Sequence, residues 1–550
     1  MKHALSSILA FLLILPASAE VTLPKIFSDH MLLQREFAAP VWGWADAGTE
    51  VTVSFAGQQK QATADANGNW IVRLEPLPPS AKGRPLQVAA GDQKLEFRNV
   101  LVGDVWICSG QSNMEMQVRS CLNAQEEIAT ADFPTIRLFD VPGHTTAPLP
   151  QSELPGGNWQ ECSPQTVENF SAVGFFFGRK LVLDTGVPVG LIGTNWGGTK
   201  VEPWTPPIGF RNVPELSEIS RAVDAVDPAH AAGKAVWSKY LAELETWAHS
   251  AKTAIEKGGA IPPETPRPGF SNGGDPTAIY NAMVHPLVPY GVRGALWYQG
   301  ESNSGDGEAY LHKLRALIEG WRTVWNQGED FPLYFYVVQL ADFGEPNTNP
   351  AGGDGFAGVR LAQSEIVKHV PHTGVGLAID IGDARDIHPR NKQDVGKRLA
   401  LWALRDIHEK EIVVSGPAFK KLKIEGEVAR VSFDHVGSGL MIGEKRGLEP
   451  VTGNIPKPEL DSLLDGLDKP KGGVLAVTPI KADLQRFAIA GENKQWFWAN
   501  AVIDGDTVVL SSSDVPKPVA VRYAYAHNPR GANLYNREGL PAVPFRTDNW

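Results

Sequence analysis

Ser112 stands at a turn where a serine hydroxyl could act as a nucleophile. An apolar, strand-like run ends at Cys108 and leads into the hexapeptide SGQSNM (109–114), which a short helical stretch follows. A hydroxyl at a tight turn from strand to helix projects above a sheet, and N–H groups at the helix start can bind a developing oxyanion. The turn is not the Gly-x-Ser-x-Gly elbow, because Met114 takes the place of the second glycine. Taken alone, such a turn is more often an ordinary serine-rich turn.

The imidazole of His388 is a second candidate group. It follows an apolar run that ends at Asp380, and Asp386 precedes it by two residues. Side chains two residues apart in an extended segment point the same way. Asp386 could therefore orient the imidazole while the other ring nitrogen takes the proton of Ser112. An Asp-x-His pattern is common on surfaces, but groups at the carboxyl ends of parallel strands gather at one sheet edge, which makes the combination with Ser112 informative.

Two more polar loops follow apolar runs of the same kind. One is GTNWGGT (193–199), whose paired glycines allow another group to approach the backbone closely. The other is YQGESN (298–303). These loops could bind an acetyl carbonyl or sugar hydroxyls, although ordinary turns from strand to helix have the same composition.

The chain pattern predicts an α/β sheet that could position these turns. In residues 100–412, strand-like apolar runs alternate with helical stretches, as in a domain with a largely parallel sheet. Two insertions, near 123–163 and 206–277, either shape a cleft or lid or run over the surface. Short alternating runs predict an immunoglobulin-sized β-sandwich at 20–99 and another β-sandwich at 413–550.

Composition and charge exclude several classes of protein. The 550 residues are 43% hydrophobic and 21% charged, with 51 Lys+Arg against 62 Asp+Glu and a net charge of −11. Several globular domains are therefore expected, and nucleic-acid binding is disfavoured. Three cysteines are too few for a disulfide scaffold or a Cys-rich zinc module, although Cys121 and Cys162 could pair in an oxidising compartment.

The first 19 residues have the pattern of a secretory signal. Lys2 and His3 precede an apolar run, and Ala-Ser-Ala at 17–19 matches a signal-peptidase site. We therefore expect cleavage before Glu20 and a secreted or periplasmic protein. No later stretch reaches ~18 uninterrupted apolar residues, so no membrane span is expected.

Four motifs, in this order, resemble those of the sialate O-acetylesterase family, a branch of the SGNH hydrolases. They are CSGQSNM (108–114), NWGGT (195–199), WYQGESN (297–303) and DIHPRNK (386–392). The likeness extends to FSDHM (27–31) and to residues 533–550, so it spans nearly the whole chain after residue 19. It implies a serine carbohydrate esterase with a flavodoxin-like SGNH-hydrolase core, N- and C-terminal β domains, and no metal or organic cofactor.

The resemblance also implies roles for individual residues. Ser112 matches the nucleophile and His388 the general base. SGNH enzymes generally place the acid three residues before the histidine, where this chain has Arg385. Asp386 is favoured instead, Asp383 is the alternative, and a Ser–His dyad oriented by a backbone carbonyl would also fit. The residues expected to form the oxyanion hole or contact substrate are Gln111, Gly197, Gly198, Gln299, Gly300, Glu301 and Asn303.

The sequence thus predicts an esterase that removes O-acetyl groups from sugars, either sialic acid or acetylated plant polysaccharide, through an acyl-enzyme. Its expected partner is the acetylated carbohydrate. Trp196, Trp204 and Trp297 could stack on sugar rings, although core packing is the more usual role for Trp297.

Two alternatives stay open. A non-catalytic carbohydrate-binding protein would have Ser112 and His388 far apart. A glycoside hydrolase could pair Glu301 with Asp342 or Glu345, but the spacing does not place two acids about 5 to 9 Å apart.

Overall fold

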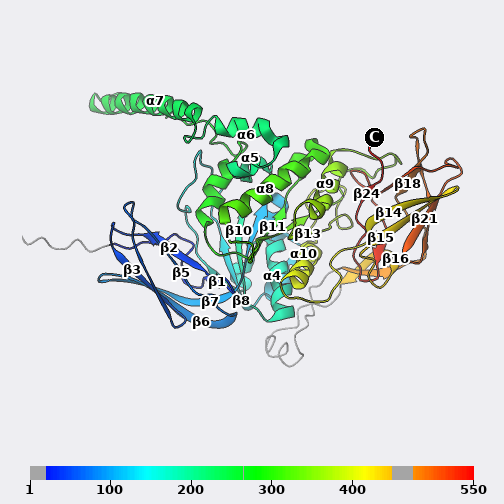
Figure 1. Cartoon of the computed structure of the whole chain (residues 1–550), viewed down its shortest axis with the longest axis horizontal. Coiled ribbons are helices and arrows are strands. Elements are labelled where there is room, and N and C mark those ends of the chain that lie inside the picture. The colour runs from blue at the N-terminus through cyan, green and yellow to red at the C-terminus, as the bar shows by residue number, and fades with distance from the viewer. Residues whose placement is uncertain (1–19, 264, 449–474) are drawn as a thin grey trace, which may run out of the picture.

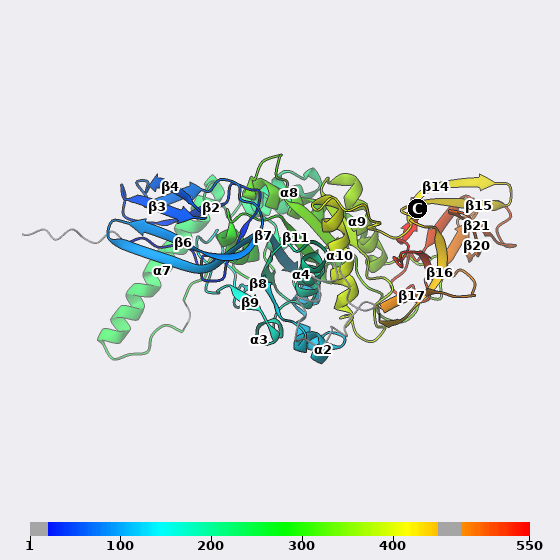
Figure 2. The ribbon, with the colours of Figure 1, turned by 90° about the horizontal axis from the view of Figure 1, so that it is seen from below.

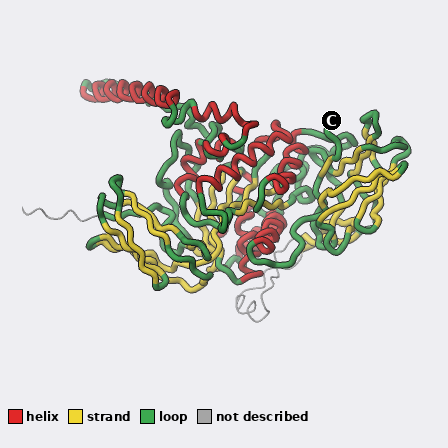
Figure 3. Tube along the Cα trace, viewed as in Figure 1, coloured by secondary structure: helices red, strands yellow, loops and turns green. Residues whose placement is uncertain are grey.

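A computed structural model describes residues 20–263, 265–448 and 475–550. Strands dominate both ends of the elongated molecule and helices its middle (Figure 3). An α/β core thus lies between two β parts. The predicted signal at 1–19 lies outside the described residues. Among the described helices, none is long and apolar enough to cross a membrane.

The N-terminal β part packs directly onto the core. Its strands alternate buried and exposed residues, as half-buried strands do. Its buried side chains belong to the same hydrophobic cluster as those of the α/β core. The strands are β1 (Leu32–Gln34), β2 (Pro40–Trp44), β3 (Glu50–Phe55), β4 (Gln58–Thr63), β5 (Asn69–Arg73) and β6 (Ser80–Ala90).

One long strand, β7 (Gln93–Gly110), belongs to both parts. Its first half pairs antiparallel with β6, and its second half pairs in parallel with two strands of the core. The boundary that the sequence predicts between 99 and 100 therefore falls inside a continuous strand. No linker stands there, because every residue from Val100 to Gly110 is buried.

The core sheet has the strand order β13-β12-β11-β7-β10-β8-β9. All neighbours in it are parallel except β8 and β9. Its strands besides β7 are β8 (Phe133–Asp140), β9 (Gln160–Cys162), β10 (Val189–Asn195), β11 (Gly294–Tyr298), β12 (Tyr334–Val338) and β13 (Thr373–Gly376). Both β8 and β9 lie within the first predicted insertion. Without them, the remaining five strands follow the order 2-1-3-4-5, with the switch of direction at β7.

Helices cover both faces of this sheet (Figures 1 and 2). On one face Trp106 of β7 contacts Phe177 of α4, which packs on α10. On the other face Trp297 of β11 contacts Trp321 of α8, which packs on α9. The four helices are α4 (Ala172–Thr185), α8 (Tyr310–Trp325), α9 (Gly355–His369) and α10 (Lys392–Asp406).

The two insertions add helices around the core. The first contributes α2 (Ala124–Ala129), and α3 (Pro164–Val167) follows it; the second contributes α5 (Pro207–Arg211), α6 (Ser217–Asp224) and α7 (Ala231–Glu256). Helix α5 packs on α8. The long helix α7 projects away from the body (Figures 1 and 2).

The C-terminal β part has a hydrophobic core of its own. Three sheets surround it, with the orders β14-β15-β21-β20, β19-β18-β22-β24 and β17-β16-β23. Their strands are β14 (Ala418–Glu425), β15 (Val428–Asp434), β16 (Leu440–Leu448), β17 (Leu475–Pro479), β18 (Phe487–Ala490), β19 (Trp496–Trp498), β20 (Asn500–Asp504), β21 (Thr507–Ser511), β22 (Ala520–Tyr523), β23 (Leu534–Asn536) and β24 (Phe545–Arg546).

Candidate active site

Ser112 is the first residue of the short helix α1 (Ser112–Glu115), directly beyond the end of β7. Gly110 makes this turn with a φ of +139°. A β-carbon at Gly110 would lie 2.2 Å from the carbonyl oxygen of Tyr298, so glycine is needed for β7 to end this close to β11. The N–H groups of a first helical turn have no acceptor within the helix. The turn therefore presents both a hydroxyl and backbone donors at the carboxyl edge of the sheet.

The structure brings Ser112, His388 and Asp386 together. His388 Nε2 lies 2.8 Å from Ser112 Oγ, and His388 Nδ1 lies 3.1 Å from Asp386 Oδ1. Asp386 Oδ1 also accepts the backbone N–H of His388 at 2.9 Å. This backbone hydrogen bond, followed by the imidazole, lowers the pKa of Asp386 below its usual value. The arrangement can take a proton from the serine hydroxyl and stabilise the imidazolium that results.

Asp383, the alternative acid, has another partner. Its Oδ1 accepts the backbone N–H of Arg385 at 2.9 Å and so closes the turn before Asp386. Among the described residues, the imidazole of His388 is therefore hydrogen-bonded to Asp386 and not to Asp383.

A buried polar network that includes Asn113 and Lys392, two residues not predicted from the sequence, lies next to Ser112. Asn113 donates its amide to Glu301 Oε1 at 2.6 Å and to the carbonyl oxygen of Ile387 at 3.0 Å. Lys392 donates to Asn113 Oδ1 at 2.5 Å, and its Nζ lies 4.9 Å from the centre of the Tyr298 ring. Asn113 and Lys392 stand next to Ser112 and near His388 within the quoted motifs, which is the signal that could have identified them.

Burial dominates the electrostatics of this network. It lowers the pKa of Lys392 to about 7, an effect that the Glu301 carboxylate partly opposes. Burial also raises the pKa of Glu301. Glu301 thus stabilises the turn that carries Ser112 through its hydrogen bond with Asn113.

Gln299 and Asn303, predicted to face the substrate, point into the protein instead. Both are buried, and Gln299 donates its amide to Thr199 O and Asn303 Oδ1 while accepting from Tyr310. Asn303 in turn accepts the backbone N–H of Val201. These side chains fasten the β11 loop to the β10 loop, because a buried amide is stable only with its hydrogen bonds made.

Gln111 and Gly300 take part in a similar internal contact. Gln111 is buried, and its Oε1 accepts backbone N–H groups from Gly300 at 3.4 Å and Ser302 at 3.3 Å. These two predicted binding residues therefore hold the loop after β11 in shape. Among the described residues, neither forms a hydrogen bond with Ser112 Oγ.

Gly197 lies against Ser112. A β-carbon at Gly197 would be 3.3 Å from Ser112 Cβ. Its backbone N–H donates to Glu115 Oε2 at 2.6 Å, whereas Gly198, with a φ of +75°, borders open space. In this arrangement the carboxylate of Glu115 competes with any ligand for the Gly197 N–H.

A polar pocket of about 180 Å³ opens beside these groups. At its rim His144 stacks on Trp196, with ring centres 4.7 Å apart, and bonds to Glu115 Oε1 at 3.0 Å. Trp204 and Trp297 are fully buried and cannot stack on a sugar. The pocket is lined by Glu115, Gln117, Asp140, Val141, Gly143, His144, Asn169, Ser171 and Asn195.

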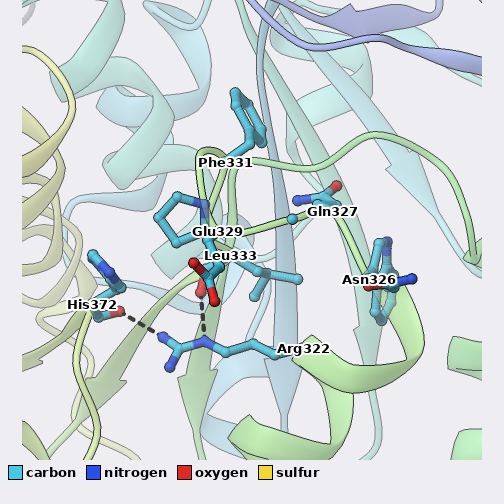
Figure 4. A pocket seen from close by; sticks show the side chains of 10 residues that line it. Arg322, Asn326, Gln327, Glu329, Phe331, Leu333 and His372 are labelled. Atoms are coloured by element: carbon cyan, nitrogen blue, oxygen red, sulfur yellow. Dashed lines mark hydrogen bonds between the residues drawn. The ribbon is translucent and has the colours of Figure 1, made fainter.

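A larger cavity, of about 480 Å³, lies where β12 and β13 begin; Figure 4 shows the side chains that line it. There Arg322 donates to the carbonyl oxygens of Leu333 and His372, just before β12 and β13 begin. This cavity is remote from Ser112, which lies at the carboxyl ends of the strands.

Asp224, Asp227 and His230 form the one cluster in the described part of the chain whose atoms could converge on a metal ion. Arg211 pairs with both aspartates, at 2.5 and 2.9 Å. The guanidinium therefore already occupies the side of this partly exposed cluster where both carboxylates meet.

The cysteines do not form the disulfide that was considered for Cys121 and Cys162. Cys108, Cys121 and Cys162 are free and buried, so the pairing of Cys121 with Cys162 is wrong. Burial raises the pKa of Cys121 to about 12, so it remains an inert thiol.

The two alternative functions lack support in this geometry. Ser112 and His388 are in hydrogen-bond contact, contrary to the binding-protein hypothesis. Of the proposed glycosidase acids, Glu301 is bonded to Asn113, and Asp342 accepts the backbone N–H of Gly382.

Comparison with known proteins identifies the family. No family model matches the chain. Rat sialate O-acetylesterase is 31% identical over 448 residues, which cover 74% of this chain and 78% of that protein. The human enzyme of the same name is 31% identical over 432 residues, covering 72% and 73%. The crystal structure of a carbohydrate acetylesterase from Xanthomonas citri, 33% identical, superposes with a TM-score of 0.74 and covers 96% of this chain and all of that one. The chain therefore belongs to the sialate O-acetylesterase family and is a carboxylic ester hydrolase.

Proposed function

We propose that this protein is a serine esterase of the SGNH-hydrolase type that removes O-acetyl groups from sugars through an acyl-enzyme. The observation that carries the proposal is the 2.8 Å contact between Ser112 Oγ and His388 Nε2, with Asp386 on the other ring nitrogen. The 2-1-3-4-5 order of five core strands, with Ser112 at the switch point, supports the fold assignment.

The reaction proceeds in two acyl transfers. Ser112 Oγ attacks the acetyl carbonyl carbon as its proton passes to His388 Nε2; the intermediate then collapses, and His388 returns that proton to the departing sugar oxygen. Water next attacks the acetyl-serine, giving its proton to His388, and acetate leaves as Ser112 regains a proton. Asp386 stays ionised and stabilises the imidazolium in both halves. Each step uses groups of this chain, so no metal or cofactor enters it.

The oxyanion is held by backbone donors. The N–H of Ser112, at the start of α1, and the N–H of Gly198 are the proposed donors. The N–H of Gly197 joins them only if the Glu115 carboxylate moves away, because that N–H donates to Glu115 in the present arrangement.

The sugar ring occupies the polar pocket beside Gly197. Carboxylate, amide and hydroxyl groups there suit a ligand rich in hydroxyl groups. Among the described residues that line the pocket, Glu115 and Asp140 are acidic and none is a lysine or arginine. Carboxylates repel an anion, so we propose an uncharged acetylated sugar as the preferred substrate, over a sialic acid with its own carboxylate.

We further propose that the enzyme acts outside the cytoplasm, on the basis of the signal pattern at 1–19.

The test is acetate release by Ser112→Ala and by a matched control, Ser109→Ala. Ser109 lies three residues earlier, and its hydroxyl is buried without a partner among the described residues. Acetate should be measured from acetylated neutral glycosides, acetylated sialosides and 4-nitrophenyl acetate. Ser112→Ala should lose at least about 10³-fold in rate, because the remaining site cannot form the acyl-enzyme. Ser109→Ala should stay within about two-fold of the wild type; an active Ser112→Ala enzyme would overturn the proposal.

A further inference from the structure

The loop that carries Asp386 and His388 has little regular structure of its own. Residues 377–391 connect β13 to α10, and their later part, 381–391, contains one isolated bridge, between Asp383 and Asp386. The side chains of Asp386 and His388 are 56% and 37% exposed. Within the loop, Asn113 donates to the carbonyl oxygen of Ile387 and Arg390 donates to that of Ser120. The 2.8 Å contact to Ser112 therefore depends on these bonds and on how the two ends of the loop are held.

Both ends of the loop carry a buried carboxylate. Asp380 directly precedes the loop and accepts two hydrogen bonds from Arg398 of α10, at 2.7 and 2.9 Å. Asp394 lies in the first turn of α10, and the side chain of Asn391, the residue that caps this helix, accepts its backbone N–H. A buried carboxylate is stable only when cations and donors compensate it.

Lys445, from β16 of the C-terminal β part, reaches both carboxylates. Its Nζ lies 3.0 Å from Asp394 Oδ2 and 3.7 Å from Asp380 Oδ2, and its side chain is 8% exposed. Tyr535 of β23, the strand paired with β16, donates its hydroxyl to Asp380 Oδ2 at 3.2 Å. Burial alone would raise the pKa of Asp380, but Arg398 and Lys445 hold it below its usual value, so this carboxylate is ionised.

We propose that Lys445 is a positioning residue for catalysis, which fastens both ends of the loop 381–391 and so holds His388 on Ser112. The C-terminal β part then supports the active site through Lys445. Without the ammonium group, the carboxyl groups of Asp380 and Asp394 would lose the cation that they share, and Arg398 would remain as the ion-pair partner of Asp380. A displacement of about 1 Å at a catalytic group can cost about 10²-fold in rate. The proposal rests on the esterase reaction proposed above, because kcat is one of its readouts.

The experiment compares Lys445→Met with Lys445→Arg in the full chain. Titration of Ser112 with a fluorophosphonate counts functional sites, and kcat for 4-nitrophenyl acetate is expressed per titrated site. We expect Lys445→Met to lower kcat per site by about 10- to 100-fold and to speed amide hydrogen exchange in 381–391. Lys445→Arg, which keeps the charge, should recover most of the loss. Lys420→Met is the matched control: Lys420 pairs with Asp434 on the surface of the same β part, and its loss should change neither readout.

Two further variants keep the test decisive. Adding Asp394→Asn to Lys445→Met removes the carboxyl group that has lost its ammonium partner and should restore part of kcat, as expected if Lys445 acts through Asp394. Tyr535→Phe removes one hydrogen bond from Asp380 without changing charge and should lower kcat per site by a few fold, even if Lys445→Met fails to fold.

The outcomes separate the two proposals. A smaller number of titratable sites with an unchanged kcat per site, or wild-type exchange in 381–391, would show that Lys445 is only structural and would overturn the inference. A wild-type protein without esterase activity would instead refute the proposed function, and hydrogen exchange in 381–391 would still test Lys445.

Discussion

His388 and Ser112 lie 276 positions apart in the chain, yet Nε2 of one is 2.8 Å from Oγ of the other. The contact forms because β7, which ends at Gly110 two residues before Ser112, lies in the middle of the sheet, while the loop after the edge strand β13 returns to this point. Only this arrangement brings a surface histidine and a serine-rich turn together as the proposed catalytic pair.

His388 should be essential for turning the serine into a nucleophile. We expect His388→Gln to lower kcat/KM for 4-nitrophenyl acetate by at least about 10³-fold, because no other described side chain bonds to Ser112 Oγ as a base. Fluorophosphonate labelling of Ser112 should slow in parallel. Unchanged labelling would show that another group activates the serine.

Asp386 and Asp383 should differ sharply. Asp386→Asn removes the carboxylate at His388 Nδ1 and should cost about 10² to 10⁴-fold in kcat, since the imidazolium loses its stabilising partner. Asp383→Asn keeps an oxygen that can accept the Arg385 N–H, so a change of less than about five-fold is expected. Steady-state kinetics of both variants decides between the two acids, and equal losses would contradict the assignment.

Lys392 should make stability depend on pH. Its pKa of about 7 in the folded protein is below that of an unfolded lysine, so the unfolded chain binds more protons between these values. The contribution of Lys392 to the free energy of unfolding should therefore rise as pH increases from about 7 to 10. In Lys392→Met this rise should be flatter, as measured by denaturant unfolding at several pH values. Parallel profiles of variant and wild type would show that Lys392 keeps an ordinary pKa.

The charges of the polar pocket should decide between uncharged and anionic sugars. Burial, followed by the nearby Glu115, raises the pKa of Asp140 to about 7, so the comparison is made at about pH 8.5, where this side chain is ionised. There Asp140→Asn removes one carboxylate and keeps the shape, so the ratio of kcat/KM for an acetylated sialoside to that for an acetylated neutral glycoside should rise by about three- to ten-fold. Asp132→Asn is the matched control, because Asp132 is exposed just before β8 begins, whereas Asp140 ends that strand. A wild-type preference for the sialoside, or a ratio insensitive to Asp140, would refute the uncharged-sugar proposal.

The residues proposed to carry the chemistry could be predicted from the chain itself. Ser112 and His388 each follow an apolar run, and the structure places Ser112 at the end of β7 as that local pattern predicts. Strand and helix alternation likewise predicted an α/β core with β parts on both sides. Such features depend on near neighbours in sequence, because turns, caps and periodicity are local properties.

Other assignments needed the tertiary structure, because they depend on which distant groups share a buried space. Gln299 stands in a motif that suggests substrate contact, yet the packing of β10 and β11 loops turns its amide inward. The strand β7 crosses the predicted domain boundary, since its two halves pair with different sheets.

The sequence by itself predicted Ser112 as the nucleophile, His388 as the base and the class of ester hydrolase. Only the tertiary structure showed that the imidazole bonds to Asp386 and not to Asp383. It also brought Lys445 from the C-terminal β part to the ends of the catalytic loop. The physical reason is the same in both cases: a buried charge or polar group requires a partner, and that partner is set by three-dimensional packing.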